Sequence, residues 1–205
     1  DDARRAAIAN LQRDPELVHD EDLWVAFTEE IVSGMGGEGP GARQCALDVV
    51  REWERHENFF LYEDALPALA PLRAAGLRLG LESNGQRDLE EFARHHGLDV
   101  DVCVGSVSHG RVKPHRSIFD AALAVLGARP DEAAMVGDSF ADDIEGARAL
   151  GMRAILLDRE WLYPDEPDRI DTLPTFGVTV ATMSCSEVSG SSWRICDSPA
   201  RPVPS

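Results

Sequence analysis

The sequence predicts an α/β fold, a Rossmann-like parallel sheet covered by helices, preceded by a small helical cap subdomain. Two observations lead to this prediction. From residue 61 onward, short apolar runs of strand length alternate with helical segments. Before residue 61, apolar residues recur at helical spacing and no strand pattern interrupts them. Strands that are separated by single helices form parallel sheets with helices on both faces.

The elements of the α/β part follow from their apolar periodicity and their end signals. A glycine follows each of the four expected helices, as is common where a helix ends in a left-handed residue. The expected helices cover residues 64–75, 86–96, 115–126 and 142–150, and the expected strands cover 77–81, 100–107, 133–137 and 153–157. We therefore divide the chain into a helical cap at 1–60, an α/β core at 61–160 and a C-terminal extension at 161–205 that we expect to be poorly ordered.

The first sixty residues contain a glycine-rich stretch, Gly34 to Gly41, between two helical segments. No strand precedes this stretch and no Lys-Ser or Lys-Thr follows it, which is typical of a flexible connector rather than a phosphate-binding loop. Trp24 and Trp53 lie at helix-compatible positions on either side of it. We expect both tryptophans in the core of the cap.

The composition excludes several classes of partner. A net charge of −17 argues against binding to nucleic acid or to an anionic membrane surface. No apolar run is long enough to span a bilayer. The four cysteines form no CxxC pair, so we expect buried, reduced thiols and a cytoplasmic protein. Only one lysine, Lys113, occurs among the 20 basic residues, and an ammonium is a compact point charge that arginine does not imitate.

Two short segments carry candidate polar residues, one after an expected strand and one before an expected helix. The turn Ser83-Asn84-Gly85 comes at the end of one strand, and Lys113-Pro114 comes just before the helix at 115–126. A hydroxyl and backbone amides bind phosphoryl oxygens, and a lysine neutralises their charge. Because ligands bind at the carboxyl ends of parallel strands, these residues are candidates for substrate binding and, for Ser83 and Lys113, for catalysis.

A third strand delivers Asp138 into a loop, and Asp142 and Asp143 open the next helix. Helix capping explains one of the latter two, but three carboxylates so close together repel one another unless a cation neutralises them. Successive helical residues point about 100° apart, so only one of Asp142 and Asp143 shares an ion with Asp138. We favour Asp143, which lies on the same helical face as Ala147, and we predict Mg²⁺ as the ion.

These motifs resemble those of a known family. In order and spacing, Ser83-Asn84-Gly85, Lys113-Pro114 and Gly137-Asp138-Ser139 with Asp143 resemble motifs II, III and IV of the haloacid dehalogenase superfamily. The resemblance covers residues 61–158, and the helical block before it matches the cap of the subfamily with an inserted helical cap. It implies that the phosphoryl group binds at Ser83 with Asn84 beside it, that Lys113 steadies nucleophile and phosphate, and that Asp138 and Asp143 hold Mg²⁺.

The family's first motif, a strand that ends in Asp-x-Asp-x-Thr or Asp-x-Asp-Gly-Thr, does not occur in these 205 residues. Its first aspartate forms an aspartyl phosphate, and its second acts as general acid and base. Since this motif precedes the cap in the family, we expect the nucleophilic aspartate upstream of Asp1. Glu82 is a second departure, because the family's strand is usually apolar at that position.

Three functions are consistent with these residues. The first is a Mg²⁺-dependent phosphatase of a small phosphorylated metabolite, with the cap selecting the substrate. The second is a catalytically inactive binding module with the same fold. The third is a 2-haloacid dehalogenase, but such enzymes typically lack the metal-binding aspartates, so Asp138 and Asp143 favour phosphate chemistry.

Overall fold

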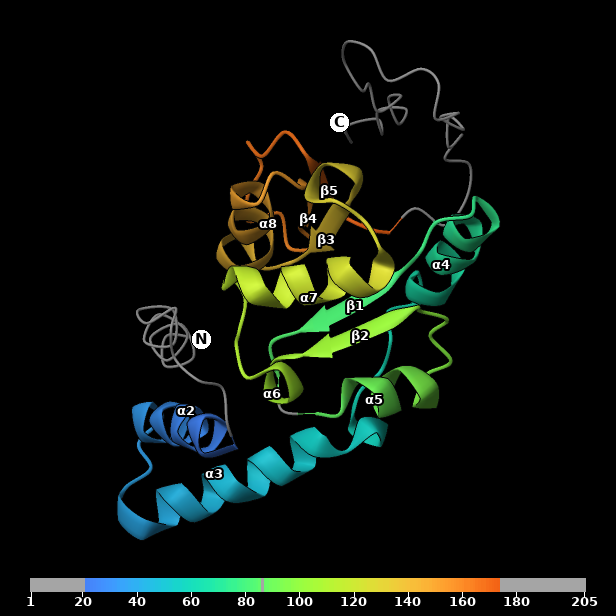
Figure 1. Ribbon diagram of the computed structural model, residues 1–205. Helices are drawn as coiled ribbons and strands as arrows, with labels where there is room; N and C mark the ends of the chain where they lie inside the picture. Colours follow the sequence, from blue (N-terminus) through green and yellow to red (C-terminus); the bar gives the residue numbers. More distant parts are fainter. Residues whose placement is uncertain (1–20, 86, 174–205) are drawn as a thin grey trace, which may run out of the picture.

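The computed structural model describes residues 21–85 and 87–173 of the chain. Helices α2 (Glu21–Gly34) and α3 (Gly39–Glu54) form a hairpin beside an α/β part that contains every strand of the described residues (Figure 1). No helix of the described residues is both long and apolar enough to pass through a membrane. The observed architecture confirms the predicted α/β class with parallel strands and helices.

The hairpin has a core of its own, made by one face of each helix. Trp24 and Phe27 of α2 meet edge to face with ring centroids 5.1 Å apart. They pack against one stripe of α3, Ala46 and Val50, and are buried there, which confirms the prediction for Trp24. Burial of these side chains supplies most of the stability of the hairpin.

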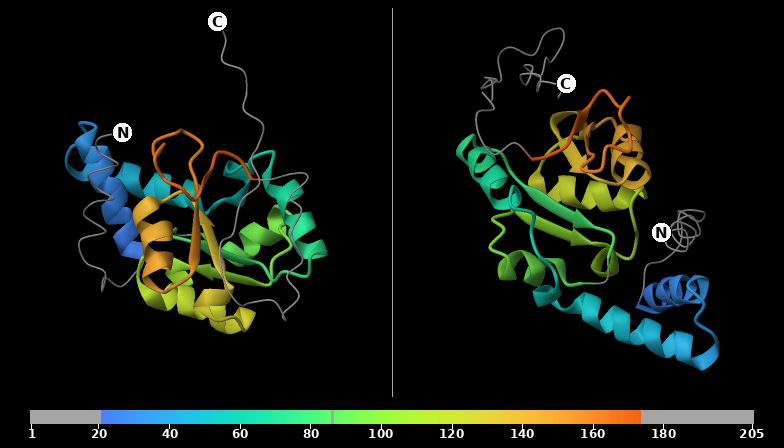
Figure 2. Two further views of the ribbon diagram at one scale, coloured as in Figure 1. Left: turned by 90° about the horizontal axis from the view of Figure 1, so that it is seen from above. Right: turned by 180° about the vertical axis from the view of Figure 1, so that it is seen from behind.

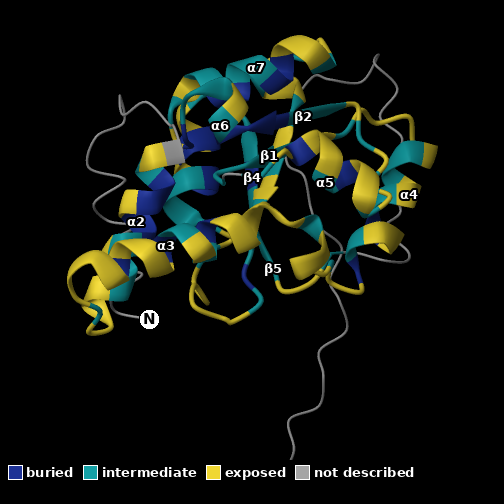
Figure 3. Cartoon of the chain, turned by 90° about the horizontal axis from the view of Figure 1, so that it is seen from below, coloured by how far each residue is buried: buried dark blue, intermediate teal, exposed yellow. Residues whose placement is uncertain are grey.

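The predictions that Trp53 and the Cys45 thiol are buried are wrong. Trp53 is 36% exposed and Cys45 is exposed. Both belong to the i, i+4 stripe 41-45-49-53, which is rotated by about 100° from the buried stripe 42-46-50. Sequence spacing alone allowed either stripe to face α2. In Figure 3 much of α3 has the yellow colour of exposed residues. Cys103 is half-buried, and Cys185 and Cys196 lie outside the described residues.

The α/β part contains short elements. Its helical segments are η1 (His56–Asn58), α4 (Ala65–Ala74), α5 (Leu89–His95), α6 (Ser106–His109), α7 (Arg116–Leu126), η2 (Pro130–Glu132), η3 (Phe140–Glu145) and α8 (Gly146–Ala149). Its strands are β1 (Gly80–Ser83), β2 (Val102–Gly105), β3 (Ala134–Gly137), β4 (Arg153–Leu157) and β5 (Arg169–Ile170). The glycines at 76, 97, 127 and 151 have φ between 58° and 84°, which confirms their expected role after the four helices.

The strands of the described residues form two parallel sheets, β1-β2 and β3-β4-β5. In the first sheet Ser83 is paired with Gly105, so β1 and β2 end at the same level. In the second sheet Gly137 is paired with Leu156. Figures 1 and 2 show β1 and β2 between α7 on one side and α5 on the other.

Helix α7 connects the two sheets through the main hydrophobic core. Ile118 and Phe119 of α7 are fully buried. They belong to one core cluster with Val104 of β2, Ile144 of η3 and Leu156 of β4. Removing a side chain such as Phe119 would cost about 3–5 kcal/mol. The core therefore fixes the carboxyl ends of β1 and β3 relative to each other.

The first predicted strand begins later than expected, at Gly80 instead of residue 77, and Leu77 is 47% exposed. Just before β1, a side chain takes the place of one backbone acceptor. The N–H of Leu79 donates to the Asp101 carboxylate at 2.6 Å, and the same carboxylate accepts from Arg73. The period-two leucines predicted a strand from residue 77, and backbone pairing does reach Leu79, whose carbonyl accepts from the N–H of Asp101 at 2.7 Å.

Two further boundaries differ from the prediction. The strand expected over 100–107 covers only Val102–Gly105, and α6 (Ser106–His109) follows it and is capped by Gly110, whose φ is 84°. The helix expected over 142–150 starts two residues earlier as a π-helical turn, η3, in which the N-cap hydroxyl of Ser139 accepts from the N–H of Asp142. Such wide turns occur frequently at functional sites.

Residues 161–173 contain more structure than the sequence indicated. Strand β5 pairs with β4, and the Glu166 carboxylate binds Arg148 through two hydrogen bonds. We expected no regular element after residue 160, because the segment is rich in Pro and Asp. Tertiary ion pairs, not local periodicity, hold it. Residues 174–205 lie outside the described residues.

A carboxylate ties three distant segments together. Asp64, at the N-cap of α4, accepts two hydrogen bonds of 2.9 Å from the Arg159 guanidinium. It also accepts from the Thr172 hydroxyl at 2.7 Å and from the N–H of Leu173 at 2.8 Å. The Asp64 carboxylate therefore joins the start of α4, the loop after β4 and the end of the described chain.

Candidate active site

The predicted site residues lie at the carboxyl ends of β1 and β3 and in the segment between α6 and α7. Ser83 is the last residue of β1, and Asp138 follows the last residue of β3. Lys113 precedes α7, and Asp143 lies in η3. The fold thus brings residues that are 60 positions apart in the sequence to one edge of the sheets.

An ion pair forms the centre of this site. The Nζ atom of Lys113 lies 2.6 Å from Oδ1 of Asp143, and the two side chains are 7% and 5% exposed. The same Nζ donates to the backbone carbonyl of Glu82 at 3.5 Å. Because Glu82 belongs to β1 and Asp143 follows β3, the Lys113 ammonium links the two sheets. A buried ion pair of this kind needs further partners to offset the desolvation of its charges.

Asn84 fixes the backbone of Lys113. The N–H of Lys113 donates to Oδ1 of Asn84 at 2.7 Å, and Nδ2 of Asn84 donates to the carbonyl of Lys113 at 3.0 Å. Both ends of the Asn84 amide are thus used inside the protein. Its side chain therefore positions the backbone of Lys113, and its role in substrate binding stays a prediction.

Ser106 fixes the backbone of Gly85 in the same way. The N–H of Gly85 donates to the Ser106 hydroxyl at 2.9 Å, and that hydroxyl donates to the carbonyl of Gly85 at 3.2 Å. The Gly85 N–H therefore already has a partner, so the predicted role of Gly85 in substrate binding does not rest on this amide. Within the described residues, the Ser83 hydroxyl makes no hydrogen bond and is the polar group of this loop that is available to a ligand.

The backbone at the end of β3 accommodates the Asp143 carboxylate. Oδ2 of Asp143 accepts from the N–H of Ser139 at 3.0 Å. A Cβ atom on Gly137 would collide with this carboxylate, so only glycine fits at that position. The Gly137-Asp138-Ser139 segment is thus shaped around Asp143.

The remaining two aspartates differ in exposure. Asp138 is exposed, and within the described residues its carboxylate has no hydrogen bond or ion pair. Asp142 is half-buried, and its N–H donates to the hydroxyl of Ser139, the N-cap residue of η3. In the part of the chain that the structure describes, no three His, Cys, Asp or Glu side chains converge in a group that could hold a metal ion. The two ligands expected for Mg²⁺, Asp138 and Asp143, flank one short loop.

Glu82 adds a second carboxylate to the buried centre. Its Oε2 atom is buried and has no hydrogen-bond partner among the described residues. Burial raises the pKa of the Glu82 carboxyl to about 7, although Lys113 lowers it, and the negative charge of Asp143 raises it further. The sequence marked Glu82 only as a departure from an apolar pattern. It did not single out Ser106, for which the signal was a hydroxyl directly after a strand.

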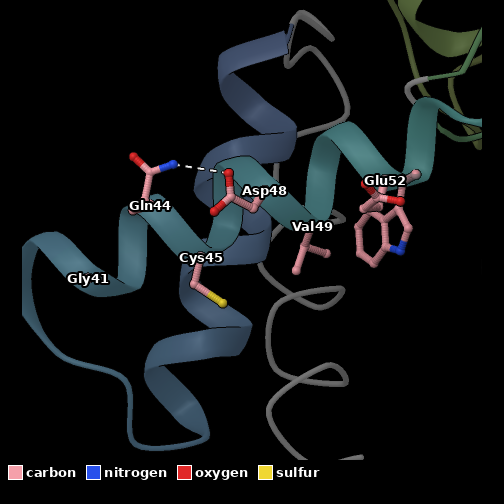
Figure 4. Close-up of a pocket in the computed structure, with 7 residues that line it drawn as sticks. Gly41, Gln44, Cys45, Asp48, Val49 and Glu52 are labelled. Carbon is pink, nitrogen blue, oxygen red and sulfur yellow. Dashed lines mark hydrogen bonds between the residues drawn. The ribbon is translucent and has the colours of Figure 1, made fainter.

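A separate cavity of about 570 Å³ lies on the outer face of α3. Figure 4 shows its lining residues, among them Cys45, Asp48 and Val49, on one helix. None of the predicted site residues lines this cavity. It is therefore not the candidate active site.

Comparison with known proteins agrees with the motifs. A family model described as haloacid dehalogenase-like hydrolase matches residues 4–151. Over 144 residues the chain is 37% identical to a phosphoserine phosphatase of Thermus thermophilus, which covers 68% of this chain and 55% of that protein. Over 115 residues it is 36% identical to a glyceraldehyde 3-phosphate phosphatase of Methanothermobacter thermautotrophicus, covering 54% of this chain and 50% of that protein. The chain thus spans about half the length of the curated relatives it matches.

A solved structure shows the same architecture. The 2-haloacid dehalogenase of Pseudomonas syringae aligns with 84% of this chain and 76% of its own, with a TM-score of 0.55 and 25% sequence identity. The family match covers residues 4–151, which is most of the chain. The chain belongs to the haloacid dehalogenase-like hydrolase family.

Proposed function

We propose that this protein is a Mg²⁺-dependent phosphatase of a small phosphorylated metabolite. The observation that carries the proposal is the assembly of Lys113, Asp143 and the Ser83–Gly85 turn between the ends of β1 and β3. It unites an unengaged hydroxyl, a buried ammonium and a buried carboxylate at one edge of the sheets. Phosphoryl transfer needs such groups, because catalysis rests on positioning and on neutralising the charge of the phosphoryl oxygens.

Each residue has a role in this proposal. The Ser83 hydroxyl would donate to a phosphoryl oxygen, and Lys113 would neutralise the charge on that oxygen. Asp138 and Asp143 would hold Mg²⁺, which lowers the negative charge of the bound phosphoryl group. The donors fit this ion, because Mg²⁺ in phosphoryl-transfer sites uses one or two carboxylates and completes its shell with water and phosphate oxygens. Asp142 stays the alternative second ligand.

We infer that the nucleophile is an aspartate upstream of Asp1, on a strand that would lie between β1 and β3. The described strands leave the outer edge of β1 and the outer edge of β3 unpaired, and unpaired edges accept an additional strand. The buried Lys113 ammonium links these two edges. An aspartate there would attack phosphorus and form an aspartyl phosphate, and a second aspartate would act as general acid and base.

We also propose that residues 1–60 form the substrate-selecting cap and 61–160 the catalytic core. The separate hydrophobic core of α2 and α3 supports this division. The names of the relatives support phosphorylated metabolites as the substrate class, since they are phosphatases of phosphoserine and of glyceraldehyde 3-phosphate. Asp138 and Asp143 favour phosphate chemistry over the dehalogenase alternative, because halide displacement by this family's fold does not need the metal.

The test uses the full-length natural protein, including any residues upstream of Asp1. Hydrolysis of O-phosphoserine, glyceraldehyde 3-phosphate and 2-chloropropionate is measured with Mg²⁺ and with excess chelator. We expect turnover of a phosphomonoester that requires Mg²⁺, and no release of chloride. Asp138→Asn should abolish Mg²⁺ binding in a calorimetric titration, whereas Asp142→Asn should retain it.

The alternatives give different results. Chloride release without Mg²⁺ would indicate the dehalogenase. Mg²⁺ and phosphate binding without turnover of any ester would indicate an inactive binding module. Loss of Mg²⁺ binding in Asp142→Asn and not in Asp138→Asn would contradict the proposed ligand set.

A further inference from the structure

The Ser106 hydroxyl is completely buried, and its two hydrogen bonds go to one residue. It accepts from the N–H of Gly85 at 2.9 Å and donates to the carbonyl of Gly85 at 3.2 Å. Ser106 has an exposure of 0%, whereas Gly85 is half-buried. The side chain thus holds Gly85 through both of its backbone polar groups. A hydroxyl suits this position because it is at once a donor and an acceptor.

This contact is one of two that join the turn after β1 to the segment after β2. Asn84 makes the other, by bonding both backbone groups of Lys113. Asn84 and Gly85 follow directly after Ser83, so the two braces leave the Ser83 turn little freedom relative to Lys113. The braces run in opposite directions, one side chain from each segment holding the backbone of the other.

The position of Ser106 also connects this turn to the hairpin. Ser106 is the first residue of α6, and the next residue, Val107, packs against the core of α2 and α3. A side chain that holds the turn thus belongs to a helix that contacts the hairpin. No other hydroxyl of α6 has this role, since Ser108 is exposed and donates to the carbonyl of Gly105 at 3.0 Å.

We propose that Ser106 is a positioning residue that fixes the Ser83–Gly85 turn, so that the Ser83 hydroxyl faces the phosphoryl group held by Lys113. This inference rests on the proposed function. Ser106 does not itself touch the substrate. Without its hydroxyl both backbone groups of Gly85 lose their partner, and the turn rearranges to satisfy them. The Ser83 hydroxyl then loses its orientation, while the buried core of α7 is unaffected.

The experiment compares the full-length protein with Ser106→Ala and with the matched control Ser108→Ala. Ser108→Ala removes a hydroxyl from the same helix without touching the turn. Three quantities are measured: turnover of para-nitrophenyl phosphate with Mg²⁺, the dissociation constant of inorganic phosphate, and the amide hydrogen exchange of Gly85. We expect Ser106→Ala to weaken phosphate binding and to lower kcat/KM, each by roughly tenfold, which corresponds to about 1.4 kcal/mol for the loss of the hydroxyl and its two hydrogen bonds.

The exchange measurement separates positioning from general destabilisation. In Ser106→Ala the Gly85 amide should exchange at least tenfold faster, while amides of α7 keep their wild-type rates. Ser108→Ala should match the wild-type protein within twofold in all three measurements. If Ser106→Ala fails to fold, Ser106→Cys replaces it, because the thiol has a similar size but forms weaker hydrogen bonds, and an intermediate loss is expected.

The outcomes are distinct. Wild-type phosphate affinity and turnover in Ser106→Ala would overturn the inference and leave the proposed function intact. Fast exchange of the Gly85 amide in the wild-type protein would overturn it as well, because the brace would not exist. A wild-type protein that neither binds phosphate nor hydrolyses the ester would refute the proposed function and this inference with it.

Discussion

Replacing Glu82 by glutamine should stabilise the protein at high pH and leave it unchanged at low pH. Glu82 has a buried, unpartnered carboxylate oxygen, and burial raises its pKa from 4.5 to about 7. In the unfolded chain the carboxyl titrates near its ordinary value. Between these two pKa values the folded protein binds a proton that the unfolded chain has lost.

The sign and size of the effect follow from this difference. Stability falls as the pH rises from 4.5 to about 7, because the folded state binds more protons in this window. Above pH 7 the buried charge costs about 3 kcal/mol, since each tenfold change in proton affinity is worth about 1.4 kcal/mol. Glutamine has nearly the same shape and no charge. Glu82→Gln should therefore gain up to about 3 kcal/mol at pH 8 and almost nothing at pH 5.

The assay is urea unfolding of both proteins at pH 5, 6, 7 and 8, with Glu63→Gln as the control. Glu63 is exposed, and its side chain makes no hydrogen bond or ion pair with the described residues. The control should follow the wild-type protein at every pH. A difference between Glu82→Gln and the wild type that does not change with pH would refute the reasoning, and so would a less stable variant at pH 8.

Two further changes test the scaffold. Asp64→Asn removes the charge that binds Arg159 and should lower the free energy of unfolding by about 2–4 kcal/mol in denaturant titrations. The guanidinium holds the Asp64 pKa well below its ordinary value, so this difference should stay constant above about pH 5 and shrink only in stronger acid; a difference that grows as the pH falls would contradict it. Gly137→Ala places a Cβ atom against the Asp143 carboxylate and should cost about 1–3 kcal/mol by the same measurement. Gly41→Ala, which meets no atom in α3, should instead gain up to about 1 kcal/mol, and equal effects of the two alanines would argue against the collision.

The local signals of the sequence determined which residues gather at the site. Ser83, Lys113 and Asp143 each follow a strand or open a helix, and parallel strands bring their carboxyl ends to one edge. The sequence also predicted where each of the four helices ends, because a glycine with a left-handed backbone follows it. The order of the motifs was enough to predict the family that the comparisons confirmed.

The tertiary structure decided what each polar side chain does at that edge. Asn84 and Gly85, which the sequence predicts to bind substrate, form hydrogen bonds with Lys113 and Ser106, which are 29 and 21 residues away. Nothing local encodes these partners. The same holds for Trp53, which lies on the stripe of α3 that is about 100° around the helix from the stripe packed against α2.

Thus the sequence by itself determined the α/β class, the helix ends and the residues of the site, because periodicity and chain reversal depend on neighbours along the chain. The tertiary structure alone decided the burial of Glu82, the pairing of Lys113 with Asp143 and the clamp at Asp64. These depend on desolvation and on charges brought together from distant segments. Such energies exist only after the chain has folded.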